Sequence, residues 1–112
     1  MKTIILDTNF IVSALKNKIN LDFSDIVTNY DLKIIDKTID ELEKLNDKYS
    51  KLAIKIIEKN KIKKIKSKER DVDHAIIKNS KDTIVATLDK ELKKQLDVPI
   101  ITIRQKKYFK IE

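Results

Sequence analysis

The sequence predicts an α/β fold, a three-layer α/β/α sandwich around a central, mostly parallel sheet. Short apolar runs rich in isoleucine and valine alternate with segments whose apolar residues recur every three to four positions. Such alternation of strands and amphipathic helices is typical of βαβ units, which place strands parallel and helices on both faces of the sheet. With 112 residues and no linker or repeat, we expect a single domain over 1–112.

The first predicted strand, 2–7, is an apolar run that ends abruptly at Asp7. Helical spacing then predicts a helix over 9–16, with Thr8 as its N-cap. The same spacing resumes after a polar break and predicts a helical segment over 21–29.

A second strand is expected at 31–36, where apolar and polar residues alternate. A helix opens at Thr38, and Thr38 with Glu41 fits a Thr-x-x-Glu capping box. The next amphipathic helix spans 49–60, with Leu52 among its inward residues and lysines on its outer face.

The second half repeats the alternation of strands and helices. We expect a short strand at 61–66, a helix at 70–79, a buried strand at 83–87, a helix at 90–96 and a strand at 100–104. The tail, 106–111, is basic and carries Tyr108 and Phe109, either as core residues or as rings that stack an unpaired base.

Composition excludes several kinds of site. The chain has no cysteine and one histidine, His74, so it cannot form a disulfide framework, a thiolate zinc site or a site built from several histidines. The N-terminal apolar run is too short for a signal peptide, and no segment approaches a membrane span. We therefore expect a cytoplasmic protein with no membrane partner.

The formal net charge is +7, and it is concentrated in the second half of the chain. The stretch 48–70 is rich in lysine and contains only Glu58 and Glu69 as acids. This asymmetry favours a polyanion such as RNA or DNA as partner, although a solvated lysine-rich surface would look the same. The expected phosphate contacts are Lys63, Lys64, Lys66, Lys68, Arg70, Arg104, Lys106 and Lys107.

Four acidic residues are expected at one edge of the sheet. Asp7 and Asp89 each follow an apolar strand, while Glu41 and Asp73 lie in first turns of helices. Carboxyl ends of parallel strands and the helix N-termini that follow them share one edge, where ligands bind in open α/β sheets. Carboxylates gathered there repel one another unless they are protonated or a cation lies among them.

Oxygen ligands without histidine or cysteine favour Mg²⁺ or Mn²⁺. Each acid also has a purely structural interpretation. Asp89 is a natural N-cap, Glu41 fits the capping box, and Asp73 suits the helix dipole. Asp7 is the hardest to explain structurally, because it ends a strand with an apolar interior.

Four segments resemble, in the same order, the four successive motifs of PIN-domain nucleases. They are Ile5–Asn9, Asp40–Leu45, Asp73–Ile76 and Ile84–Leu92. The resemblance covers essentially the whole chain and implies a small α/β/α sandwich with metal-dependent endoribonuclease activity. It implies that the acidic ligands are Asp7, Glu41, Asp73 and Asp89, supported by Thr8, Asn9 and Thr87.

The resemblance also bears on substrate and partners. The ending from Val98 to Tyr108 resembles short archaeal PIN proteins related to endonucleases of small-subunit rRNA processing. We therefore expect RNA, structured or single-stranded, as substrate. A toxin ribonuclease with an antitoxin partner is the alternative, and a homodimer is a candidate assembly because PIN relatives often dimerise.

Two departures from the family pattern motivate another alternative. Many relatives carry two adjacent aspartates where this chain has Asp73-His74, and Leu88 replaces the usual asparagine of the last motif. A catalytically degenerate RNA-binding module would tolerate both. A flavodoxin-like regulatory domain is a further alternative, but it needs an acid pair beside the first strand, and Lys2–Leu6 contains no acid.

Overall fold

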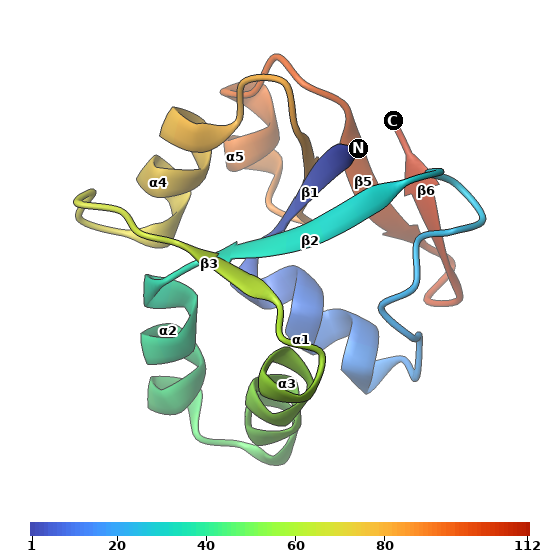
Figure 1. The fold of residues 1–112 in the computed structure, drawn as a ribbon. Coiled ribbons are helices and arrows are strands. Elements are labelled where there is room, and N and C mark those ends of the chain that lie inside the picture. Colours follow the sequence, from blue (N-terminus) through green and yellow to red (C-terminus); the bar gives the residue numbers. More distant parts are fainter.

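A computed structural model describes all residues 1–112 (Figure 1). The strands are β1 (Lys2–Leu6), β2 (Tyr30–Ile35), β3 (Lys63–Ile65), β4 (Ile84–Ala86), β5 (Ile100–Arg104) and β6 (Tyr108–Ile111). The helices are α1 (Thr8–Lys16), α2 (Lys37–Leu45), α3 (Lys48–Lys59), α4 (Val72–Asn79) and α5 (Lys90–Lys94). None of the five helices has the length and apolar character that a transmembrane segment needs.

The strands form one six-stranded sheet in the order β3-β2-β1-β4-β5-β6. Pairing is parallel from β3 to β5, and only β6 runs antiparallel to its neighbour. Helices α1, α2 and α3 cover one face, and α4 and α5 cover the other (Figure 1). The predicted α/β sandwich with a mostly parallel sheet is confirmed.

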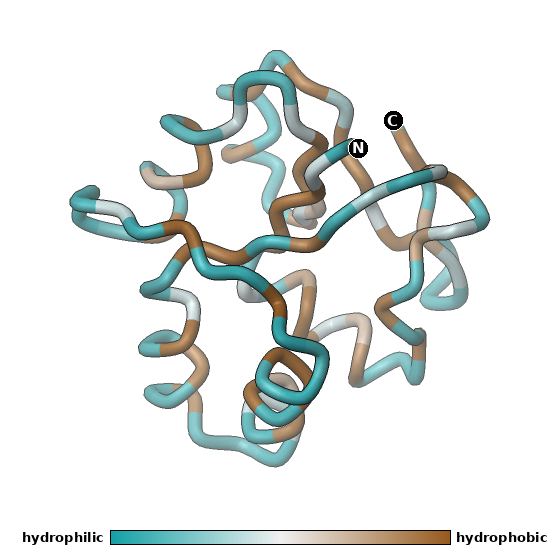
Figure 2. Tube along the Cα trace, in the orientation of Figure 1, coloured by the Kyte–Doolittle hydropathy of each residue, from teal (hydrophilic) through white to brown (hydrophobic).

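Strand β1 lies at the centre of both cores. Ile4 and Leu6 point into the core under α1, α2 and α3, while Ile5 points into the core under α4 and α5. All three side chains are fully buried, which explains why the strand reads as a continuous apolar run instead of an alternating one. In Figure 2 the hydrophobic colour is concentrated along the central strands, and hydrophilic residues colour much of the outer helices and loops.

Register aligns the ends of the central strands. Leu6 pairs with Ala86, and Ala86 pairs with Ile101. The residues that follow, Asp7 and Thr87, therefore emerge side by side at the carboxyl edge of the sheet. The local structure of the sheet thus places two polar side chains from distant parts of the sequence next to each other.

The helix expected at 21–29 is absent, which corrects the prediction. The segment makes a single turn, in which the Val27 N–H donates to the Phe23 carbonyl at 2.9 Å. Phe23 is fully buried, and its ring stacks on Phe109 with centroids 4.5 Å apart. The apolar spacing in this segment therefore reflects anchoring of a loop by an aromatic cluster, and not a helical face.

The tail forms β6, which the sequence did not predict. Gln105 and Lys106 both adopt left-handed conformations, with φ of 53° and 56°, and the Lys107 N–H donates to the Arg104 carbonyl at 3.0 Å. Phe109 packs in the core, whereas Tyr108 is 46% exposed. Of the two aromatics, only Tyr108 is free to stack on a ligand.

Three smaller expectations are also wrong. Asp7, not Thr8, is the N-cap of α1. The capping box of Thr38 and Glu41 does not form, because Asp36 caps α2 by accepting from the Lys37 N–H. Leu52 is 43% exposed instead of facing inward.

Candidate active site

Asp7 is the buried centre of the acidic site. Its Oδ1 accepts from the Thr8 N–H at 2.9 Å, and its Oδ2 accepts from the Thr87 hydroxyl at 2.8 Å. Its own N–H donates to the Ala86 carbonyl at 2.9 Å, which continues the sheet ladder. Only 5% of the residue is exposed, so both backbone and side chain are held in one orientation.

Burial raises the pKa of Asp7 from 3.8 to about 6, and desolvation is the largest cause. The nearby carboxylates of Asp73 and Glu41 raise this pKa further, while the hydrogen bonds from Thr87 and Thr8 lower it. Three of the four predicted acids therefore interact electrostatically at one place.

Glu41 joins the site through Thr8. The Thr8 hydroxyl, at the first residue of α1, donates to Glu41 Oε1 across to α2. Because Asp36 is the N-cap of α2, Glu41 has no capping role and its carboxylate turns toward α1. The structural explanation of Glu41 offered by the sequence is thus excluded by the structure.

Asp73 and Asp89 complete the group. The pKa of Asp73 is raised by desolvation first, then by the charges of Asp89, Asp71 and Glu41. Asp89 is the N-cap of α5, and its Oδ1 accepts from the Glu91 and Leu92 N–H groups at 2.9 and 3.2 Å. Its Oδ2 has no such bond, so capping leaves one oxygen of Asp89 available.

Thr87 connects the two strand ends. Its hydroxyl donates to Asp7 and accepts from the Asp89 N–H at 3.1 Å. The structure therefore links Asp7, Glu41, Thr8, Thr87 and the Asp89 backbone through hydrogen bonds. Asp73 lies near enough for its charge to interact with those of Asp7, Asp89 and Glu41.

The four carboxylates have no positive partner. None of the six ion pairs in the structure includes Asp7, Glu41, Asp73 or Asp89, although the chain has 25 Lys and Arg residues. No three acidic or histidine side chains are close enough to form a complete set of metal ligands. The donors are nevertheless all hard oxygens, the kind that Mg²⁺ and Mn²⁺ prefer.

Comparison with known proteins agrees with this geometry. The chain is 36% identical to ribonuclease VapC4 of Methanocaldococcus jannaschii, over 99% of this chain and 97% of that protein. It superposes on the PIN domain endonuclease Utp24 with a TM-score of 0.83 and 28% identity, over 98% of this chain and 90% of that one. The chain belongs to the PIN-domain nucleases. No family model matches the sequence.

His74, which departs from the PIN pattern, lies beside the acids without joining them. Its Nδ1 is 2.7 Å from Asp71 Oδ1, and its Nε2 is 3.1 Å from an Arg70 nitrogen. Both ring nitrogens of His74 therefore contact Arg70 and Asp71 at the start of α4, and neither contacts one of the four acids. The other departure, Leu88, packs partly buried against the core.

The expected phosphate-binding residues of this PIN domain are all exposed, in two groups. One group lies on β3 and the loop that follows it: Lys63, Lys64, Lys66, Lys68 and Arg70. The other lies at the β5–β6 turn: Arg104, Lys106 and Lys107. β3 and β6 are the two edges of the sheet, and both loops follow carboxyl ends of parallel strands, so the groups flank the acids from opposite sides.

Two further cations lie on α2 that the charge distribution of the sequence does not single out. Lys37 and Lys44 lie four residues before and three residues after Glu41, a spacing that puts side chains on one side of a helix. Both line hollows that also include Glu41. Their spacing from Glu41 could have predicted from the sequence that both lysines lie beside the site.

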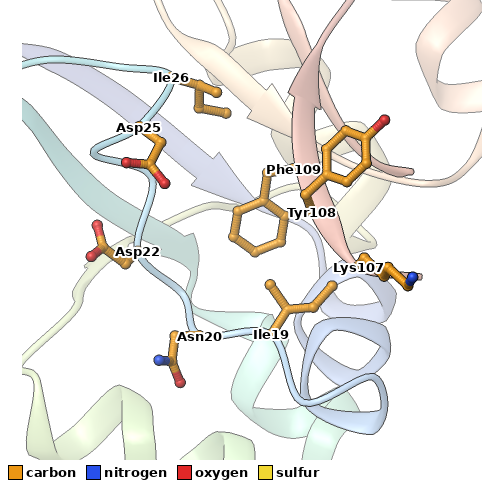
Figure 3. A pocket seen from close by; sticks show the side chains of 8 residues that line it. All are labelled: Ile19, Asn20, Asp22, Asp25, Ile26, Lys107, Tyr108 and Phe109. Carbon is orange, nitrogen blue, oxygen red and sulfur yellow. The ribbon is translucent and has the colours of Figure 1, made fainter. Parts of the chain in front are cut away.

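A separate hollow of about 480 Å³ lies away from the acids, between the 19–26 segment and β6. Figure 3 shows Phe109 and Ile19 in its interior, with Asp22 and Asp25 on the side opposite Tyr108 and Lys107. None of the four acids of the PIN-domain site contributes to it.

Proposed function

We propose that this PIN domain is a divalent-metal-dependent endoribonuclease that hydrolyses RNA phosphodiester bonds. Support comes from the relative named ribonuclease VapC4, the structural neighbour named endonuclease Utp24, and the acidic site itself. The basic residues on both sides of that site suit an RNA backbone.

The observation that carries the proposal is the unpaired charge at Asp7. A carboxylate that is 5% exposed, next to two further carboxylates and without a cation, destabilises the folded protein at neutral pH. A purely structural role needs no charge at this position, because an asparagine would still accept from the Thr8 N–H through its carbonyl oxygen and would donate from its amide to the Thr87 hydroxyl. A functional requirement for negative charge explains the aspartate.

The donor set fits a divalent cation by its chemistry. In this proposal Asp7 and the free oxygen of Asp89 would hold the principal Mg²⁺ or Mn²⁺, and Asp73 and Glu41 would support it at longer range. Mg²⁺ keeps several waters and needs only one or two carboxylates, so a complete protein cage is not required. When bound, the ion supplies Lewis acidity and offsets negative charge on the phosphate.

The chain's own residues fix the geometry. Thr87 and the Thr8 N–H orient the two oxygens of Asp7, and the Thr8 hydroxyl orients Glu41. Such restraint keeps the carboxylates in place when a substrate phosphate approaches. Asn9 is exposed and lines a hollow together with Glu41, and in this proposal it contacts the ribose or base of the bound strand.

A matched pair of substitutions on α2 tests this proposal. Glu41→Gln and Glu43→Gln each remove one acid from the same helix, but only Glu41 belongs to the site. We expect Glu41→Gln and Asp7→Asn to lose RNA cleavage in the presence of Mn²⁺, and Glu43→Gln to retain it. If Asp7→Asn cuts a structured RNA as fast as the wild type, the proposed mechanism is wrong.

For the substrate, we propose processing of rRNA. The C-terminal segment resembles archaeal PIN proteins related to small-subunit rRNA endonucleases, and the likeness to Utp24 covers nearly the whole chain. Incubation with a precursor of small-subunit rRNA should give cleavage at one discrete position. Cleavage spread over many positions would count against this role.

A toxin ribonuclease is the second candidate, because the curated relative is named VapC4. This role requires an antitoxin protein as partner. It predicts growth arrest when the chain is expressed alone, and relief of that arrest by the product of a neighbouring reading frame. Normal growth on expression of an active enzyme would exclude it.

A further inference from the structure

Two hollows lie on either side of Glu41 along α2. The first, about 360 Å³, is lined by Thr8, Asn9, Glu41, Lys44 and Leu45. The second, about 240 Å³, lies between α2 and the segment before α4 and includes Lys37, Arg70 and Asp71. Glu41 and Lys44 line both, so the two hollows adjoin at these residues, and we refer to them together as the path along α2; Glu41 is the acid of the site that lines it.

Lys44 is the free cation at the middle of this path. It lies one helical turn after Glu41, so both side chains lie on the same side of α2. The residue is exposed, and none of the ion pairs in the structure includes it. Its ammonium group is therefore available to an anionic ligand, despite the nearby carboxylates.

The cations at the far end of the path are held in place. Arg70 lies 3.6 Å from Asp71 and 3.1 Å from the His74 ring nitrogen, so one side of its guanidinium is engaged. Lys37 donates to the Glu69 carbonyl, which ties the start of α2 to the segment that carries Arg70. Arginine held in this way can still present its remaining N–H groups to a phosphate.

The order of chemical groups along the path suggests its ligand. An apolar surface at Leu45, 50% exposed, and the amide of Asn9 line the first hollow, Lys44 and Glu41 line both hollows, and Arg70 lines the second. A small anion needs one cation, whereas two cations separated by a catalytic site suit a polymer with repeated phosphates. The apolar and amide groups suit an exposed nucleoside.

We propose that this path binds one unpaired RNA strand along α2. Lys44 holds the phosphate on the α1 side of the cleaved bond, with the adjoining nucleoside against Asn9 and Leu45. Arg70, positioned by His74 and Asp71, holds the phosphate on the other side. This inference rests on the proposed function, because it takes RNA as substrate, but it assigns the binding residues independently of the metal.

Salt-dependent binding of a labelled single-stranded oligoribonucleotide, measured in EDTA so that no metal-dependent cleavage occurs, tests the assignment. Lys44→Ala should flatten the slope of log K against log salt by about 0.7, the value for one lost phosphate contact on a single strand. In the presence of Mn²⁺ its KM should rise about tenfold with little change in kcat. Lys44→Arg should restore most of the binding.

Lys55→Ala is the matched control, because Lys55 is exposed on α3 and lines neither hollow. If Lys44→Ala changes binding no more than Lys55→Ala does, the assignment is wrong even when the wild type cleaves RNA. If the wild type binds RNA but never cleaves it, the proposed function fails, and the Lys44 comparison still decides this inference.

Discussion

Asp7 shows at the scale of one residue how a functional site opposes stability. Its folded pKa is about 6, above the unfolded value of 3.8. At a pH between 3.8 and about 6, Asp7 is protonated in the folded state and ionised in the unfolded state. The stabilisation from the protonated group is complete below the unfolded pKa and is lost as pH rises through the folded pKa.

This sign gives the first prediction. At pH 7.5 the free energy of unfolding of Asp7→Asn should exceed that of the wild type by about 3 kcal/mol. The reason is that burial of a neutral amide does not require desolvation of a charge. The difference should shrink toward zero near pH 4. Denaturant titrations of both proteins across this range measure it. Because the other acids titrate in both proteins, their effects largely cancel in the difference, and a difference independent of pH would contradict the pKa shift.

At the scale of the element, the N-terminus of α2 contains an unsatisfied hydroxyl. Thr38 Oγ1 is buried without a hydrogen-bond partner, since Asp36 caps the helix instead. Thr38→Val should therefore raise the free energy of unfolding by roughly 1 kcal/mol and leave cleavage unchanged.

Thr87→Val is the control for this prediction, because Thr87 is equally buried but its hydroxyl makes two hydrogen bonds. It should lower stability by roughly 1–3 kcal/mol and impair cleavage. Urea unfolding of both variants is the measurement. A loss of stability in Thr38→Val would show that its hydroxyl has a partner.

The backbone conformation of the turn between β5 and β6 also lowers the stability of the folded protein. The chain has no glycine, and Gln105 and Lys106 occupy left-handed conformations that favour glycine. They are the central residues of the turn that the bond from the Lys107 N–H to the Arg104 carbonyl closes. Lys106→Gly should be more stable than Lys106→Ala by roughly 1 kcal/mol, since both lose the charge but only glycine relieves the strain. Equal unfolding free energies would contradict this turn geometry, and both variants should bind RNA more weakly than the wild type.

At the scale of the whole molecule, the sequence predicts the layers and the carboxyl edge better than the loops and the tail. Asp7 and Asp89 each follow a buried strand, and parallel topology alone then brings them together. Phe23 had helical spacing but belongs to an aromatic cluster with Phe109, a contact between distant segments that local periodicity does not encode. The same contact holds β6 against the core, and the basic composition of β6 shows no alternation that would predict a strand.

The binding residues show the same limit. Total charge identified the lysines on β3 and at the β5–β6 turn, whereas Lys37 and Lys44 were missed because they lie among acids in a segment without net positive charge. Their importance depends on hollows formed by α1, α2 and the loop before α4. Placement of side chains around a site depends on tertiary packing, which sequence spacing only suggests.

The central claim is that four distant carboxylates converge to hold a divalent cation. A crystal structure of the protein grown with Mn²⁺, with anomalous diffraction at the manganese edge, tests it most directly. We expect an anomalous peak in contact with oxygens of Asp7 and Asp89, with Asp73 and Glu41 at most one water away. A manganese-containing crystal with no peak at this edge of the sheet would contradict the account.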